Sequence, residues 1–235
     1  MAIWENLPRV KRHGTELFIS MAIDVNEFVS VVQPALEQGR PDDVAALVAE
    51  RWTTEEVCGL LEHDQPTVRR LAAAAAGLIG ECGCSQYLVV ALHDEDAAVH
   101  ETAEHAIWQV WFHCCKPAAT GPFQQGMEYL QQDELDEAVT CFHRCQQADP
   151  KFAEAYHQCA IAHYLAGDYD QAMDDCERTL ELIPIHFGAL AQMGHCHMQR
   201  GEWCKALDAY RSALRINPRM PGIDMAVERL ERKVG

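Results

Sequence analysis

The chain has 235 residues, of which 49% are apolar and 23% are charged, so it can form the core of one or two modest domains. Its formal net charge of −17 argues against nucleic acids and anionic membrane surfaces as partners, because both favour clusters of lysine and arginine. No apolar run has the length of a membrane span, and none follows Arg9 and Arg12 as it would in a signal peptide, so we expect an acidic, cytoplasmic protein.

Eleven cysteines are distributed along the chain, and most of them lie within helical patterns without paired spacing. A secreted disulfide scaffold is usually short and rich in loops, and this chain is neither. We therefore expect reduced thiols, many of them serving as small core residues.

Residues 1–23 are predicted to form an N-terminal arm. Met1-Ala2-Ile3 recurs as Met21-Ala22-Ile23, and helical patterning begins only after the second copy, so Met21 is an alternative start. Asp24 then resembles a helix N-cap with Glu27 as its capping partner, and an amphipathic helix follows. A second helix begins at Pro41.

Residues 53–81 and 84–115 share one layout, in which a short helix is followed by a polar break and a longer helix. Apolar and small residues recur 31 positions apart in the two units: Leu61 and Leu92, Val68 and Val99, Ala72 and Ala103. This pattern resembles HEAT repeats of the short bacterial kind, with 24–52 as a degenerate first unit. The resemblance implies stacked helix pairs over residues 24–115.

Residues 116–122 contain Pro117, Gly121 and Pro122, and we predict that they form a non-helical linker. After it, prolines recur every 34 residues, at Pro150, Pro184 and Pro218. A fixed period of this length predicts stacked helix pairs, because a single pair cannot bury its own apolar face.

The repeats at 119–152, 153–186 and 187–220 resemble tetratricopeptide (TPR) repeats. Three sets of residues carry the resemblance on the 34-residue period: Gly126, Ala160 and Gly194 where paired helices touch, Ala138, Ala172 and Ala206 in the second helix, and the three prolines. His163 and His197 stand where the family has tyrosine, and Pro122 where it has an aromatic residue.

Residues 221–235 are predicted to form a C-terminal capping helix. The predicted fold class is therefore all-α: an α-solenoid of HEAT-like helix pairs, followed by three TPR pairs and the capping helix.

No complete catalytic set is visible. His100-Glu101 resembles one His-Glu step of deoxyhypusine hydroxylase, a HEAT-repeat di-iron family that needs four steps, but the preceding unit has Arg69-Arg70 at that position. His100 and His105 are five residues apart and would point about 140° away from each other on a helix, so they do not form a zinc-protease motif. Nucleophile elbows and phosphate-binding loops are also absent from the sequence, and we expect a non-enzymatic protein.

Cysteine and histidine are dense at four places: Cys82-x-Cys84, His113-Cys114-Cys115, Cys141-x-His143-x-Cys145 and His195-Cys196-His197. None has the Cys-x-x-Cys pairing of a zinc ribbon, and Cys145 and Cys176 fall on TPR core positions, so we predict neither a metal nor a cofactor. Two alternatives stay open. One is a Cys/His metal or redox sensor, and the other is an enzyme or enzyme-accessory protein, because short HEAT-like repeats also resemble the phycobilin lyase family.

The TPR resemblance implies that the first helix of each pair, helix A, lines a concave groove through repeat positions 2, 5, 9 and 12. The predicted groove residues are Phe123, Met127, Leu130, Glu154, His157, Ile161, Tyr164, Ala191, His195 and Met198. Most are apolar, so we expect a scaffold or adaptor whose partner is a protein or peptide, presented as a helix or an apolar segment.

TPR proteins that bind the C-terminal carboxylate of heat-shock chaperones use a clamp of lysines, asparagine and arginine. The corresponding positions here hold Phe123, Met127, Gln158, Gly188 and Gln192. A carboxylate needs charged donors, so we do not expect a chaperone tail as the ligand. The alternative to an open groove is that Phe123, Met127 and Met198 are covered by the first half of the chain or by a second copy.

Overall fold

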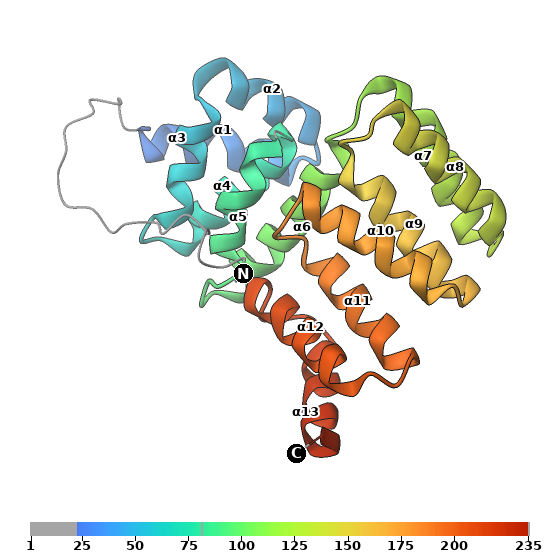
Figure 1. The fold of residues 1–235 in the computed structure, drawn as a ribbon. Coiled ribbons are helices and arrows are strands. Elements are labelled where there is room, and N and C mark those ends of the chain that lie inside the picture. The colour runs from blue at the N-terminus through green and yellow to red at the C-terminus, as the bar shows by residue number, and fades with distance from the viewer. Residues whose placement is uncertain (1–22, 81, 235) are drawn as a thin grey trace.

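The computed structural model describes residues 23–80 and 82–234, which fold into helices without any strand (Figure 1). The all-α solenoid predicted from the sequence is confirmed. The predicted N-terminal arm lies outside the described residues except for residue 23, and so does the choice between Met1 and Met21 as the start. No described helix combines the length and apolar character needed to cross a membrane.

The described part of the first half contains six α-helices: α1 (Val25–Glu37), α2 (Pro41–Arg51), α3 (Thr54–Gly59), α4 (Pro66–Ile79), α5 (Ser85–Ala91) and α6 (Ala97–His113). The carboxylate of Asp24 caps α1 by accepting hydrogen bonds from the backbone N–H groups of Asn26 and Glu27. Thr53 and Glu56 form a reciprocal capping box at α3. Local side-chain chemistry thus sets where these helices begin.

Helices α4 and α6 pack closely because one residue at their crossing is glycine. A Cβ atom added at Gly77 would lie 2.7 Å from the Cβ of Ala106. The positions that repeat at 31-residue spacing are all buried in this core. The HEAT-like identity of these pairs stays a prediction.

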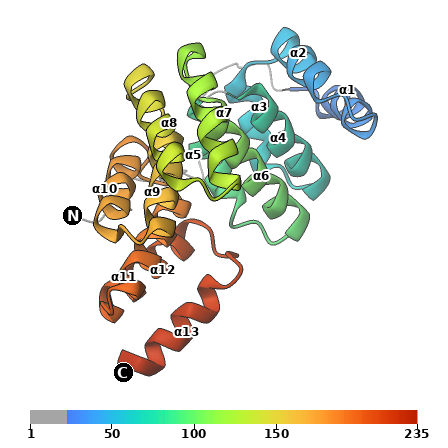
Figure 2. The same cartoon turned by 90° about the vertical axis from the view of Figure 1, so that its right-hand side faces the viewer.

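The second half forms three helix pairs and a final helix: α7 (Pro117–Gln131) with α8 (Leu135–Ala148), α9 (Ala153–Ala166) with α10 (Tyr169–Leu182), α11 (Phe187–Gln199) with α12 (Trp203–Ile216), and α13 (Ile223–Val234). A Cβ atom added at Gly194 would lie 2.4 Å from the Tyr210 ring, so only glycine fits between α11 and α12. Figure 2 shows α13 extending from the C-terminal end of the stack.

The prediction that residues 116–122 form a non-helical linker is wrong, because all but residue 116 lie in α7. Pro117 occupies the first turn of α7, where an N–H has no helical partner in any case, and Pro122 lies inside the same helix. The carbonyl that Pro122 leaves without a donor belongs to Ala118, which is exposed, so water can satisfy it. The change from one half to the other is therefore confined to the residues between α6 and α7.

The two halves share a core. Phe187 and Ile216 from the second half are buried in the same apolar cluster as residues from α1 to α6. Phe112 of α6, in turn, packs against the cluster formed by α7, α8 and α9. The halves therefore pack as one body.

Among the described residues, Cys114 is disulfide-bonded, which corrects the expectation of reduced thiols. The spacing of cysteines in the sequence does not predict which sulfur atoms lie close together in the fold. The cytoplasmic location inferred partly from the cysteines stays a prediction.

Candidate functional site

Helix α6 presents two tryptophans to the second half of the chain. The Trp111 ring stacks on His186, with 4.1 Å between ring centroids and an interplanar angle of 17°. Trp108 stacks on His157 at 5.9 Å and meets the edge of Phe187 at 5.3 Å. Because His157 lies in α9 and Phe187 begins α11, α6 covers the N-terminal ends of two A helices.

A buried carboxylate contacts both of these histidines. Glu154 is 0% exposed, and its Oε1 accepts a hydrogen bond from Gln158 Nε2 at 2.7 Å and lies 3.0 Å from His157 Nδ1. Its Oε2 lies 3.1 Å from His186 Nε2. The other ring nitrogen of His186 accepts the backbone N–H of Ala189, so the proton resides on Nε2 and is donated to Glu154.

The surroundings fix the charge states of this network. Burial penalises the Glu154 carboxylate, but attraction to and hydrogen bonding with His157, and then with His186, outweigh that penalty and hold its pKa well below the usual range. Burial, reinforced by His157, lowers the pKa of His186 to about 4. At neutral pH, the network therefore contains an ionised Glu154 and a neutral His186.

We expect acid to destabilise the fold through His186. The unfolded chain protonates this side chain near pH 6.5, whereas the folded chain does so only near pH 4. The unfolded state thus binds more protons in this window, and stability falls as the pH decreases, by roughly 2 kcal/mol between pH 7.5 and pH 5. Glu154 adds a loss of the same sign below pH 4.5, because its folded pKa is depressed.

Urea unfolding between pH 7.5 and pH 5 measures this effect. The variant His186→Gln keeps an N–H donor for Glu154 but does not titrate, so its stability should depend less on pH. His113→Gln, at an exposed position of α6, is the matched control and should keep the wild-type slope. If the free energy of unfolding changed equally with pH in the wild type and in His186→Gln, His186 would not be the cause of the pH dependence.

The predicted groove residues divide into two groups. Four are buried: Phe123, Glu154, His157 and Ala191. Six are half-buried: Met127, Leu130, Ile161, Tyr164, His195 and Met198. Part of the covering comes from α6, since Phe112 contacts the Phe123 ring at 5.8 Å and Trp108 stacks on His157. We call the six half-buried residues the open A-helix face.

Tyr164 and His195 bring two A helices together on this face. Their rings are 6.1 Å apart between centroids, and the Tyr164 hydroxyl accepts a hydrogen bond from Gln199 Nε2 at 3.1 Å. Burial lowers the pKa of His195, whose Nδ1 lies 2.7 Å from the Tyr210 hydroxyl. The ring is therefore neutral, and this part of the face combines apolar surface with uncharged hydrogen-bonding groups.

At two of the positions that correspond to the chaperone-tail clamp, the space is already taken by contacts within this protein. Gln158 donates to the buried Glu154, and a side chain at Gly188 would meet Trp108 at 2.8 Å and His157 at 3.2 Å. A ligand carboxylate placed here would meet another carboxylate, with no lysine or arginine at these positions.

The structure does not assemble the enzymatic candidates. His100 is buried, and its Nδ1 lies 2.7 Å from the Leu92 carbonyl oxygen, whereas His105 is exposed. Sequence reasoning also missed a grouping of His143, Cys159 and His163. Its sequence signals are the Cys/His-dense run around His143, the spacing of Cys159 and His163, four residues apart on one helix, and the histidine at a tyrosine position of the repeat.

Comparison with known proteins shows that most of the second half is similar to proteins with TPR repeats. The family described as "Anaphase-promoting complex, cyclosome, subunit 3" matches residues 131–213. A TPR repeat-containing protein from Rhizobium etli is 33% identical over 86 residues, which are 37% of this chain and 39% of that protein. Hsp70-Hsp90 organizing protein 1 from Glycine max is 26% identical over 113 residues, covering 46% of this chain and 20% of that protein.

Solved structures also resemble part of the chain. The Arabidopsis OM64 TPR domain matches with a TM-score of 0.49 and 19% identity, covering 50% of this chain and 97% of that one. The first TPR of Spaghetti (RPAP3), bound to an HSP90 peptide, matches with a TM-score of 0.48 and 20% identity, covering 50% and 93%. The chain spans only about a fifth to two fifths of the length of the two curated relatives named above.

Proposed function

We propose that the protein is a non-enzymatic adaptor that binds a protein partner on the open A-helix face. The observation that carries the proposal is the set of half-buried residues that α6 leaves uncovered on α7, α9 and α11. TPR arrays bind their partners through such faces, and α6 provides a fixed wall at one end. Relatives such as the organizing protein from Glycine max support an adaptor role in general, and the choice of partner rests on the residues of this chain.

The partner we propose is an amphipathic helix or an apolar segment. Leu130, Ile161 and Met198 offer apolar area, and Met can adapt its shape to a partner surface. The hydroxyl of Tyr164 and the neutral ring of His195 can hydrogen-bond to uncharged polar groups at the edge of such a segment. None of the ten predicted groove residues is lysine or arginine, which disfavours an acidic peptide.

Charge substitutions on the open A-helix face test the proposal. We expect the combined variant Leu130→Glu, Ile161→Glu and Met198→Glu to weaken partner binding at least about tenfold, because buried apolar contacts dominate interface energies. Partners captured from cells by the wild-type protein would be identified by mass spectrometry, and their affinities then measured with purified components.

The matched control is a second triple variant that introduces three glutamates at exposed apolar residues outside this face. Val90 on α5 and Met225 and Val234 on α13 are 43%, 67% and 39% exposed and lie on none of the A helices, so Val90→Glu, Met225→Glu and Val234→Glu should leave binding unchanged. If both triple variants bind the partner as the wild type does, this face is not the binding site.

A second arm distinguishes the chemistry of the partner. The peptide SRMEEVD, which occupies the first TPR of Spaghetti, serves as an acidic probe in fluorescence polarisation. We expect no saturable binding to this chain, because the clamp cations are missing. Saturable binding that is lost on raising the salt concentration would replace the apolar segment with an acidic tail as the ligand class.

A further inference from the structure

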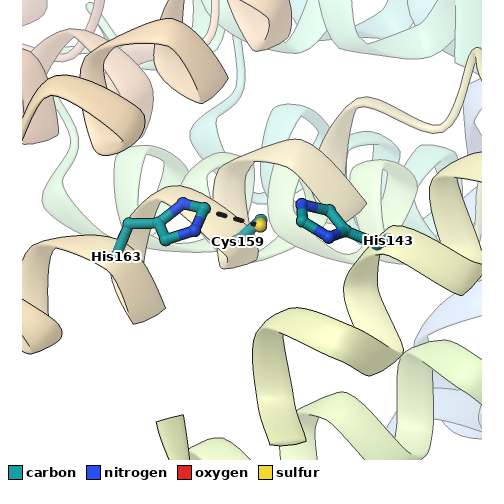
Figure 3. A group of neighbouring side chains, drawn as sticks. All are labelled: His143, Cys159 and His163. Atoms are coloured by element: carbon teal, nitrogen blue, oxygen red, sulfur yellow. Dashed lines mark hydrogen bonds between the residues drawn. The ribbon is translucent and has the colours of Figure 1, made fainter. Parts of the chain in front are cut away.

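Three metal-ligating side chains from two repeats meet between α8 and α9. His143 comes from α8, and Cys159 and His163 come from α9. Each offers one ligand atom, and these atoms lie within 4.8 Å of one another. Figure 3 shows the Cys159 sulfur between the two imidazole rings, with the hydrogen bond to His163 drawn as a dashed line.

We propose that His143, Cys159 and His163 bind a zinc ion. In a tetrahedral zinc site, bonds of about 2.0–2.3 Å place neighbouring ligand atoms roughly 3.3–3.8 Å apart. The Cys159 sulfur and His163 Nδ1 are already 3.8 Å apart. One thiolate with two imidazoles is a donor set that suits zinc better than the hard cations calcium and magnesium.

A carboxylate adjoins the three donors. Asp175 Oδ2, from α10, lies 2.9 Å from His163 Nδ1. Because His163 Nδ1 would bind the ion and could then no longer donate a proton to Asp175, this carboxylate would provide the fourth donor, and with the Cys159 thiolate it would balance the charge of a divalent ion. The site would then join three helices from two consecutive repeats.

The grouping has both a solvent-facing and a buried side. His143 is exposed, whereas His163 is 8% and Cys159 0% exposed. An ion can therefore arrive from solvent at His143. Without a metal, burial and then the nearby Asp175 raise the pKa of the Cys159 thiol, so metal binding must release its proton and should weaken as the pH falls.

The repeat register shows that packing alone does not require these residues. One repeat later, the positions of His143, Cys159 and Asp175 are occupied by Glu177, Met193 and Ala209. That repeat retains the histidine, as His197, but its Nδ1 pairs with Glu202 instead. The complete donor set thus occurs only between the first and second repeats.

Equilibrium dialysis of reduced, chelator-stripped protein against zinc, followed by elemental analysis, tests the proposal. We expect one equivalent in the wild type. His143→Gln changes an exposed side chain and should leave the fold intact, yet it should weaken zinc binding by at least about 100-fold, beyond the effect usual for an outer-shell partner. His113→Gln and Cys204→Ser, at an exposed histidine and an exposed cysteine away from the site, should bind zinc as the wild type does.

Cobalt provides an independent readout. Cobalt(II) in the wild-type protein should show the visible bands of tetrahedral coordination and a thiolate charge-transfer band, and Cys159→Ser should lose the latter. Circular dichroism would verify that each variant is folded. Less than half an equivalent of zinc in the wild type, or unchanged affinity in His143→Gln, would overturn the proposal.

Discussion

Replacing Trp111 with alanine is expected to lower the free energy of unfolding by about 3–5 kcal/mol. The side chain is 2% exposed, and its ring lies on His186 and beside Phe187, where α6 meets the TPR half. Its removal leaves a cavity in the core that the halves share, and helices on both sides would have to move to close it. Urea denaturation followed by circular dichroism measures the loss.

The variant Trp111→Phe separates the stacking from the size of the ring. Trp111 Nε1 has no hydrogen-bond acceptor among the described residues, so phenylalanine removes no bond while keeping a ring against His186. We expect it to lose less than half as much stability as Trp111→Ala. A loss below about 1 kcal/mol for Trp111→Ala would mean that the halves do not depend on this contact.

Replacing Glu154 with methionine is expected to cost about 3–5 kcal/mol, because three side chains lose their shared acceptor and each buried polar group left unsatisfied costs about 1–3 kcal/mol. Methionine nearly conserves the volume, so the cost reports the lost acceptor. Gln158 and the two histidines would keep their buried polar groups but lose the carboxylate that they contact. Equilibrium unfolding at pH 7.5 measures the change.

Two further variants calibrate this result. Glu154→Gln keeps one oxygen acceptor but places an amide N–H₂ where a second acceptor was, so we expect an intermediate loss. Glu128→Met removes an exposed carboxylate from α7 and should change stability by no more than about 0.5 kcal/mol. If Glu154→Met were as stable as the wild type, the network would be a tolerated arrangement and not a stabilising one.

Part of the candidate site could be predicted from sequence and part could not. The repeat register placed Ile161, Tyr164 and Met198 on A helices, where they remain half-buried. It also placed Glu154 and His157 there, but both are buried, and the Trp108 ring stacks on His157. The 34-residue register assigns each residue a position within its repeat. Whether that position is buried depends on which other part of the chain packs against it.

The linker prediction failed for a related reason. Prolines and a glycine near residue 120 are typical of a break, yet the chain continues as α7 because Pro117 falls in the first turn and the carbonyl that Pro122 leaves without a donor belongs to the exposed Ala118. Propensity describes a residue averaged over many contexts. Its position within one helix determines the actual cost.

The sequence by itself determined the all-helical class, the 34-residue TPR spacing and many of the helix ends, including the Thr53–Glu56 capping box. These features depend on backbone hydrogen bonds and side-chain contacts between residues close together in the chain. Only the tertiary structure decided that α6 covers one end of the A helices and that His143 meets Cys159 and His163. Such groupings depend on how helices distant in sequence rotate and pack against one another, and the pattern within any one helix does not specify this.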